Sequence, residues 1–262
     1  MEKRVFVVTG SNRGIGYAVV KGLARSIDNA VVYLTARKIA EGEESVRKIK
    51  EELGAELKSD VHAVALDIGD EKSGRNLSAF LEKTHGGIDN DATESPFHQA
   101  DVTIGINYYG TKLISSILTP LIRPNGRVVN VCSQAGVMTG RYSDNLIAVL
   151  HNPEVTEEQI DQFVEQYKKL AKEDQRKAGG YPESAYCVSK AAEIALTMIQ
   201  ARELKGKGIK VNACCPGYVS TNMSSYKGQL TIEEGADTPL FLATDPNAPE
   251  GKFVYLRKEI AW

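Results

Sequence analysis

Short runs of β-branched residues alternate with segments of helical periodicity along this chain, and this alternation restricts its fold more than any other feature. The strand-like runs lie at 4–8, 30–36, 61–66, 127–131, 210–215 and 252–256. After the first run, apolar residues recur on one helical face at Ile15, Ala18, Val19 and Leu23. Repeated strand–helix–strand units predict an α/β fold built on a doubly wound parallel sheet with flanking helices.

The composition favours a single domain with small-molecule partners. The 262 residues include 32 basic and 34 acidic side chains, and the formal net charge is -2. No global positive field therefore points to nucleic acid or to an anionic membrane. The sequence has no internal repeat, low-complexity tract or Pro-rich linker. We expect one domain over residues 1–262, large enough to bury a sizeable core.

The start of the chain and its cysteines predict a cytosolic protein without a metal site. The first apolar run is too short for the core of a signal peptide, and no later run could span a bilayer. The four cysteines show no metal-type spacing, and the four histidines are scattered. Free thiols fit a reducing compartment.

A glycine-rich loop, TGSNRGIG at residues 9–16, joins the first predicted strand to the first helix. Gly10 allows the chain to turn off the strand, and Gly14 and Gly16 leave no side chain between the helix N-terminus and a bound pyrophosphate. One or two glycines would fit a plain turn, whereas three in this context predict a dinucleotide site in a Rossmann-type fold. The residues predicted to bind cofactor here are Gly10, Ser11, Asn12, Arg13, Gly14, Ile15 and Gly16.

The end of the second strand predicts which dinucleotide binds. A ribose with a free 2′-hydroxyl usually meets an acidic side chain there, but this chain offers Ala36 followed by Arg37. We therefore expect a 2′-phosphate, held by Arg37 and Arg13. Two solvated surface arginines are the alternative. Asp67 and Ile68, just past the third strand, are placed to flank the adenine; a helix-capping Asp67 is the alternative.

The chemistry is predicted to lie in SAYCVSK, residues 184–190. Tyr186 and Lys190 are four residues apart, so on a helix they share one face, and an ammonium near a phenol lowers the pKa of the phenol. Tyr186 is then a plausible proton donor. Ser133 follows a predicted parallel strand, where α/β sheets bind ligands, and its hydroxyl could hold a carbonyl oxygen. A Tyr-x-x-x-Lys spacing alone is common, but its order after a glycine loop and a strand-end serine is far more specific.

Together these motifs resemble the short-chain dehydrogenase/reductase family over almost the whole chain, and within it the carbonyl reductases. The likeness lies in VVTGSNRGIG, LTAR, INYYGT, RVVNV, SAYCVSK, VNACCPGYVSTNM and FVYLRKEIAW. The resemblance implies NADPH-dependent reduction of ketones, aldehydes or quinones. It also implies that Tyr186 is the general acid, that Lys190 holds the nicotinamide ribose, and that Ser133 orients the carbonyl.

The resemblance assigns further residues that spacing alone does not. Asn107 in INYYG matches the family's helix asparagine, which holds a proton-relay water near the lysine. The others lie in CCPGYVSTNM: Pro216 and Gly217 in the turn beside the nicotinamide, Val219 at its carboxamide, Thr221 at the pyrophosphate, and Tyr218 in the wall of the substrate pocket.

A helical insertion is predicted at 141–182, between Ser133 and Tyr186. Thr156 and Gln159 fit a capping box, and one stripe of the following helix is apolar: Ile160, Phe163, Val164, Tyr167 and Leu170. The stripe packs inside the molecule or against a partner, and the first is the commoner case. A comparable insertion in carbonyl reductases covers the surface that related enzymes use to oligomerise, so the resemblance implies a monomer.

The stretch after Asp89 departs from the family pattern. Enzymes of this kind continue GGID with a run like ILVNNAG, the fourth strand and the turn beside the cofactor, whereas here Asn90, Asp91 and Ala92 follow directly. About ten residues are missing, judged by a typical strand and its turn. We interpret the polar segment as a loop, so the central fourth strand is expected to be absent. A splice or gene-model variant, a deliberate deletion, or recruitment of VTIGI (102–106) into the gap would explain the pattern; recruitment would pull Asn107 out of its helix.

Two hypotheses for the function follow. The intact motif residues favour an NADPH-dependent carbonyl reductase. A chain without its central strand would instead be a catalytically impaired or non-catalytic protein, a weak cofactor binder or an interaction protein, because unpaired edges inside a sheet are costly.

Overall fold

The computed structural model describes residues 3–85, 88–93, 103–221 and 224–262. The strands are β1 (Arg4–Val8), β2 (Ala30–Ala36), β3 (Asp60–Ala65), β4 (Ile88–Thr93), β5 (Ile122–Val131), β6 (Lys210–Cys215), β7 (Phe253–Tyr255) and β8 (Lys258–Glu259). The longer helices are α1 (Gly14–Ser26), α2 (Ile39–Leu53), α3 (Glu71–His85), α5 (Thr111–Leu118), α6 (Asp144–Leu150), α7 (Glu157–Lys172), α8 (Ala185–Leu204) and α9 (Ile232–Thr244). The predicted strands therefore form where their apolar runs lie.

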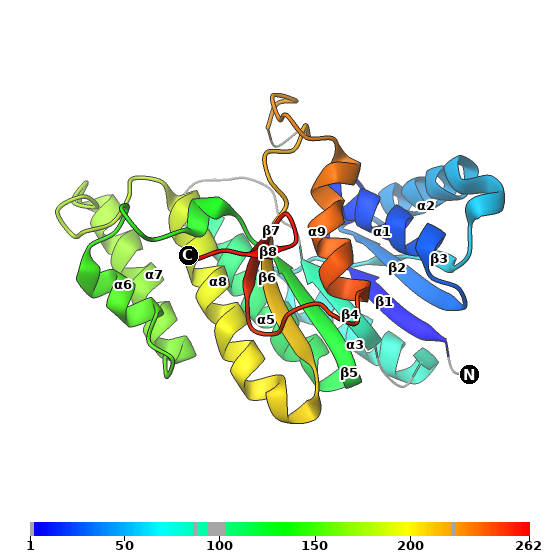
Figure 1. Ribbon diagram of the computed structural model, residues 1–262, viewed down its shortest axis with the longest axis horizontal. Helices are drawn as coiled ribbons and strands as arrows, with labels where there is room; N and C mark the ends of the chain where they lie inside the picture. Colours follow the sequence, from blue (N-terminus) through cyan, green and yellow to red (C-terminus); the bar gives the residue numbers. More distant parts are fainter. Residues whose placement is uncertain (1–2, 86–87, 94–102, 222–223) are drawn as a thin grey trace.

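The described strands form one sheet with the order β3-β2-β1-β4-β5-β6-β7-β8, and only β7 and β8 pair in an antiparallel manner. Helices cover both faces of this sheet (Figure 1). The result is a Rossmann-type doubly wound fold, as the alternation of strands and helices predicts.

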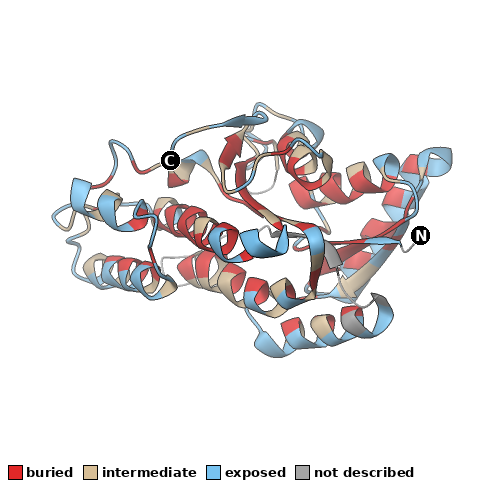
Figure 2. Ribbon diagram, turned by 60° about the horizontal axis from the view of Figure 1, so that its bottom comes forward, coloured by how far each residue is buried: buried red, intermediate tan, exposed pale blue. Residues whose placement is uncertain are grey.

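The core forms two layers because successive strand residues point to opposite faces of the sheet. Phe6 and Val8 of β1 pack with α1, α2 and α9, whereas Val5 and Val7 pack with α3, α5 and α8. Figure 2 shows the buried residues gathered on the sheet and on the helix sides that face it. A parallel sheet covered on both faces explains why strands such as β1 and β2 are nearly continuous apolar runs.

The expected absence of a central fourth strand is wrong. β4 lies between β1 and β5, with Asn90, Asp91 and Ala92 opposite Phe6, Val7 and Val8 of β1. Its pairing with β5 shifts register between Ile88 and Asn90. The physical reason is that backbone N–H and C=O groups of β1 and β5 need partners whatever side chains supply them, since each buried unpaired group costs about 1 to 3 kcal/mol. A polar segment therefore takes the strand position.

The alternative that residues 102–106 are recruited into the sheet is also wrong, as judged from residues 103–106, which the structure describes. Residues from Thr103 onward are helical, and a π-helix at Gly105–Gly110 leads directly into α5. Asn107 therefore stays in a helix, as the family pattern requires.

The apolar stripe of α7 packs inside the molecule. Ile160, Phe163, Val164 and Tyr167 are buried and join a cluster with residues of α8. The predicted capping box is confirmed, because Thr156 accepts from the Gln159 amide and the Gln159 side chain accepts from the Thr156 amide.

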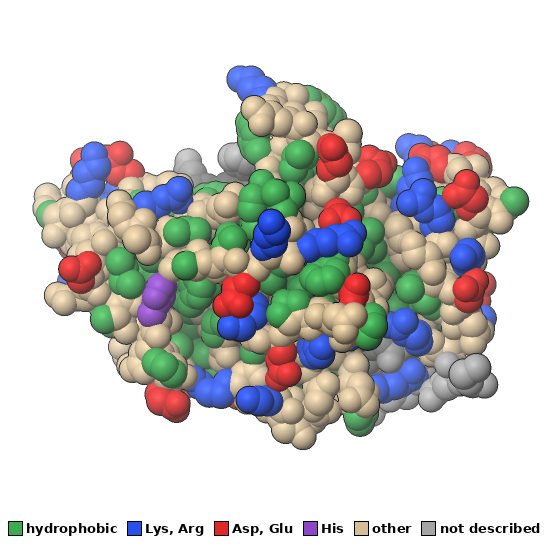
Figure 3. Space-filling view, viewed as in Figure 1, with side chains coloured by type: hydrophobic (Ala, Val, Ile, Leu, Met, Phe, Trp, Pro, Cys, Tyr) green, Lys and Arg blue, Asp and Glu red, His purple; other side chains and the backbone are tan. Residues whose placement is uncertain are grey.

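Two surface properties bear on partners. None of the helices in the described ranges is long and apolar enough to cross a membrane. On the face seen in Figure 3, basic and acidic side chains are interspersed rather than separated.

Candidate active site and cofactor cleft

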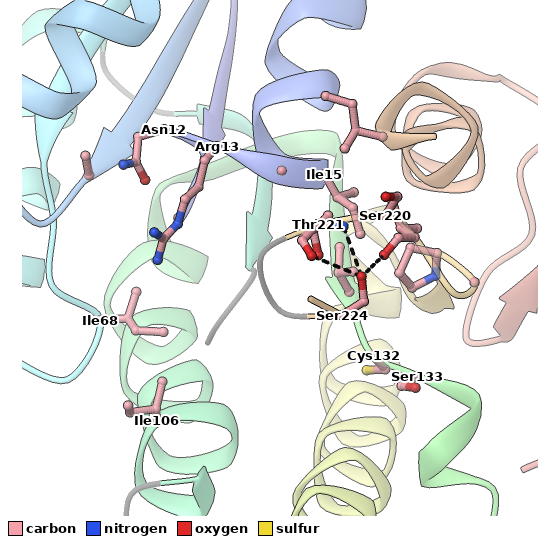
Figure 4. Close-up of a pocket in the computed structure, with 18 of the residues that line it drawn as sticks. Asn12, Arg13, Ile15, Ile68, Ile106, Cys132, Ser133, Ser220, Thr221 and Ser224 are labelled. Carbon is pink, nitrogen blue, oxygen red and sulfur yellow. Dashed lines mark hydrogen bonds between the residues drawn. The ribbon is translucent and has the colours of Figure 1, made fainter. Parts of the chain in front are cut away.

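A cleft of about 880 Å³ opens at the carboxyl ends of the parallel strands (Figure 4). Gly10 follows β1, Ala36 ends β2, Leu66 follows β3, Val131 ends β5 and Pro216 follows β6, and all five line it. This is the sheet edge at which open α/β folds bind ligands.

Most of the predicted site residues line this one cleft. They are Gly10, Asn12, Arg13, Gly14, Ile15, Arg37, Asp67, Ile68, Ser133, Tyr186, Lys190, Pro216, Gly217, Tyr218, Val219 and Thr221. Ser11, Gly16 and Asn107, which the structure also describes, are not part of its lining.

The glycine loop forms a cradle at the N-terminus of α1. Gly14 begins the helix with a φ of 60°, a left-handed conformation that favours glycine. A Cβ at Gly16 would lie 2.8 Å from the Cα of Ser11, so the helix start can approach the loop only without a side chain there. Backbone N–H groups at a helix start attract anions, so the cradle fits the pyrophosphate of a dinucleotide.

Ser11 has a structural role behind this loop. Its hydroxyl donates to the Val8 carbonyl over 2.6 Å and accepts from the Thr35 amide over 3.0 Å. Ser11 therefore ties β1 to β2, and its predicted cofactor contact is not a side-chain contact with the cleft.

The predicted 2′-phosphate subsite contains an anion as well as cations. Arg13 extends into the cleft toward Ile68 in Figure 4, and Arg37 also lines the cleft. Glu41, which the sequence analysis missed, lines it too and accepts a hydrogen bond of 3.2 Å from the Asn12 amide. The signal that could have identified Glu41 is its position in the first turn of α2, four residues after Arg37.

Tyr186 and Lys190 share one face of α8, one turn apart. The helix begins at the Ser184 cap, so Tyr186 lies in its first turn and 37% of the residue is exposed at the cleft. The Lys190 ammonium is buried, 5.8 Å from the centre of the Tyr186 ring, and donates to the Val131 carbonyl over 3.1 Å. The predicted Tyr–Lys constellation is therefore assembled.

The net shift of the Tyr186 pKa differs from the sequence-based expectation. Burial raises the pKa of the phenol above its ordinary value, and the Lys190 charge and the Ser133 hydroxyl lower it only in part. Glu193, one turn further along α8, also raises it. The phenol therefore keeps its proton at neutral pH, as a proton donor must.

Ser133 is held beside α8 by a short 3₁₀ turn. Its hydroxyl accepts from the Ala135 amide over 3.1 Å and caps the turn Gln134–Gly136. A Cβ at Gly136 would lie 2.7 Å from the Lys190 carbonyl carbon, so glycine allows this turn to touch the helix. Close packing thus fixes Ser133 near Tyr186.

Asn107 lies behind the cleft. It is buried, and its amide donates to the Ser189 hydroxyl over 3.0 Å. Its neighbour Ile106 lines the cleft instead. A water-holding role for Asn107 stays a prediction.

The loop after β6 forms another wall. The single hydrogen of the Ser224 hydroxyl is shared between the Val219 and Thr221 carbonyls, and the hydroxyl accepts from the Thr221 amide, as the dashed lines of Figure 4 show. Tyr218 and Tyr226 are both well exposed beside it. Tyr226 was missed because no motif includes it.

Comparison with known proteins supports this reading of the motifs. The sequence profile described as short chain dehydrogenase matches residues 4–143 and 175–230. The chain belongs to the short-chain dehydrogenase family. The stretch between the two matched ranges contains α6 and α7.

Among curated relatives in this family, carbonyl reductase (NADPH) 1 of Macaca fascicularis is 38% identical over 278 residues, covering 99% of this chain and 98% of that protein. The protein of the same name from Homo sapiens is 38% identical over 277 residues, covering 98% of each chain. These alignments are longer than the chain, so they place gaps in it.

Two solved structures superpose closely on this chain. Salutaridine reductase from Papaver somniferum has a TM-score of 0.85 at 27% identity, covering 96% of this chain and 99% of that one. Menthone neomenthol reductase from Mentha piperita has a TM-score of 0.84 at 26% identity, covering 99% and 100%.

Proposed function

We propose that this chain is an NADPH-dependent carbonyl reductase that acts on ketones, aldehydes or quinones, with Tyr186 as the general acid. The observation that carries the proposal is that Ser133, Tyr186 and Lys190 line the same cleft as the glycine loop and Arg37. Relatives named carbonyl reductase (NADPH) 1, similar over nearly the whole chain, support the cofactor and the substrate class.

The chemical properties of the cleft residues match the parts of NADPH that they would hold. The cradle at Gly14 would hold the pyrophosphate, and Arg13 and Arg37 would hold the 2′-phosphate. Asp67 and Ile68 would flank the adenine, and Lys190 would hold the nicotinamide ribose. The remaining contacts would come from the loop after β6: Pro216, Gly217, Val219 and Thr221, with Tyr218 facing the substrate.

NADPH, when bound, supplies the hydride for the carbonyl carbon. Negative charge then builds on the carbonyl oxygen, and the hydroxyls of Ser133 and Tyr186 donate hydrogen bonds to it. Tyr186 gives up its proton to complete the alcohol, and Lys190 stabilises the phenolate that remains. General acid assistance of this kind typically contributes about 10² to 10⁴ in rate.

We also propose a cytosolic monomer with 141–182 as a helical insertion. Burial of the α7 stripe against α8 supports the monomer, because that face is already covered inside the chain. The cysteines Cys132, Cys187, Cys214 and Cys215 are free thiols, which fits a reducing compartment.

The test combines binding and turnover. NADPH fluorescence is titrated with the protein, and NADPH oxidation is followed with an activated dicarbonyl and with a quinone. Binding together with turnover supports the proposal, whereas binding without turnover of either substrate class supports the non-catalytic alternative. That alternative depended on a missing central strand, and β4 removes its structural basis.

A further inference from the structure

A buried carboxylate lies directly beside the proposed catalytic lysine. Glu193 follows Lys190 by three residues on α8, so the two side chains share a helix face. The Lys190 Nζ lies 2.7 Å from a carboxylate oxygen of Glu193, and the side chains are only 6% and 3% exposed. Charged side chains are almost never buried to this extent unless they are paired.

Glu193 lies behind Lys190 and does not itself reach the cleft. Lys190 lines the cleft, whereas Glu193 is not part of the lining. On the protein side, the ammonium donates to the Val131 carbonyl and forms an ion pair with Glu193. The carboxylate therefore contacts the ammonium inside the protein, away from the cleft lining.

Glu193 is itself anchored. The Thr111 hydroxyl at the start of α5 donates to the other carboxylate oxygen over 3.3 Å. The backbone carbonyl of Glu193 accepts from the Thr197 hydroxyl over 2.7 Å. The contact from α5 therefore helps to fix the carboxylate beside Lys190.

The other groups around Lys190 do not replace this negative charge. The thiols are Cys132, directly after β5, and Cys214 and Cys215 on β6. Burial raises the pKa of Cys132 and of Cys215, so both stay neutral thiols at ordinary pH. Tyr186 is a neutral phenol, and the Thr111 hydroxyl does not titrate in this range.

We propose that Glu193 is a positioning residue that keeps Lys190 charged inside the protein and partly offsets its field at Tyr186. The inference rests on the proposed function, because it assigns Lys190 a role in reduction. Burial lowers the pKa of Lys190, and only the combined effect of the neighbouring groups, among which the charge of Glu193 contributes most, raises the pKa of the lysine above its ordinary value. Burial likewise raises the pKa of Glu193, and the charge of Lys190 opposes that rise. Both Lys190 and Tyr186 therefore hold their protons to higher pH, which suits an enzyme that must donate a proton to its substrate.

The direct test follows the charge of Lys190 without cofactor. The ¹⁵N resonance of its ammonium, assigned by its loss in Lys190→Met, is titrated with pH in the wild type and in Glu193→Gln. We expect the lysine of the variant to lose its proton at least about one pH unit lower. Glu193→Met is a second neutral variant whose flexible thioether needs no polar partner, and Glu193→Asp should restore most of the wild-type titration.

A second readout is the pH profile of carbonyl reduction. The alkaline limb of kcat/KM should move to lower pH in both neutral variants. Asp161→Asn is the matched control, because that carboxylate pairs with Lys112 over 2.8 Å outside the cleft, and it should leave the limb unchanged. An unchanged Lys190 titration in a folded neutral variant overturns the inference. Failure to bind NADPH or to reduce a carbonyl would instead count against the proposed function.

Discussion

The side-chain amide of Asn107 donates to the hydroxyl of Ser189, and that hydroxyl donates over 2.9 Å to the backbone carbonyl of Tyr186. These two bonds connect the π-helix that precedes α5 to the first turn of α8. Asn107 therefore supports the proposed acid from behind the cleft, whether or not it also holds a relay water.

Replacing Asn107 by alanine should lower the free energy of unfolding by about 1 to 3 kcal/mol, because the buried Ser189 hydroxyl loses its donor. Chemical denaturation measures this loss. Ser189→Ala is the paired variant, and the double variant should cost less than the sum of the two single ones. Strictly additive losses would show that the two side chains do not act together.

A substitution at Asp91 tests why a polar segment forms the central strand. It registers with Val7 of β1 on one side and with Val128 of β5 on the other. Strands at this position are covered on both faces and favour apolar residues, so Asp91→Val should stabilise the protein by about 1 to 3 kcal/mol.

The matched control is Asp60→Val in the edge strand β3, where Asp60 is exposed and paired with Lys3. This control should not stabilise. Thermal or urea unfolding of both variants decides the point, and a destabilised Asp91→Val protein would mean that β4 depends on that carboxylate.

Arg37→Ala should weaken NADPH binding by about 1.5 to 3 kcal/mol, the scale of a charge-assisted hydrogen bond, and leave NADH nearly unaffected. Fluorescence titration with both cofactors measures the difference. Lys38→Ala removes the neighbouring cation, which is highly exposed and is not part of the described lining, and should change little. Equal losses for both cofactors would exclude a 2′-phosphate contact.

Glu41 should act in the opposite sense at the same subsite. Its carboxylate is exposed and accepts from Asn12, so Glu41→Gln keeps that hydrogen bond and removes one negative charge. Screened by water, this change should tighten NADPH binding by about twofold to tenfold, with a smaller effect on NADH. Weaker NADPH binding would indicate that Glu41 contacts the cofactor favourably.

The sheet could be predicted well where apolar β-branched runs carry the signal. The runs at 4–8, 30–36 and 210–215 coincide with β1, β2 and β6 because strands buried on both faces need continuous apolar residues. β4 could not be predicted in this way. Its residues are polar, and its conformation follows from the unpaired backbone of its two neighbours, which local sequence does not reveal.

The candidate site, too, could be predicted only where local sequence properties determine it. Motif spacing brings Tyr186, Lys190 and Ser133 into one cleft, because helix periodicity and strand ends are local properties. The net pKa direction of Tyr186 was missed, since it depends on burial and on Glu193 rather than on Lys190 alone. The burial of Tyr186 and the charges around it can be identified only from the packed structure.

The most direct test of the central claim is Tyr186→Phe, with NADPH affinity and carbonyl turnover measured on the same samples. The phenol acts mainly in the transition state, so kcat should fall by about 10² or more while the dissociation constant for NADPH stays within about twofold. A folded Tyr186→Phe protein that keeps most of its kcat would show that another group donates the proton and would contradict the account.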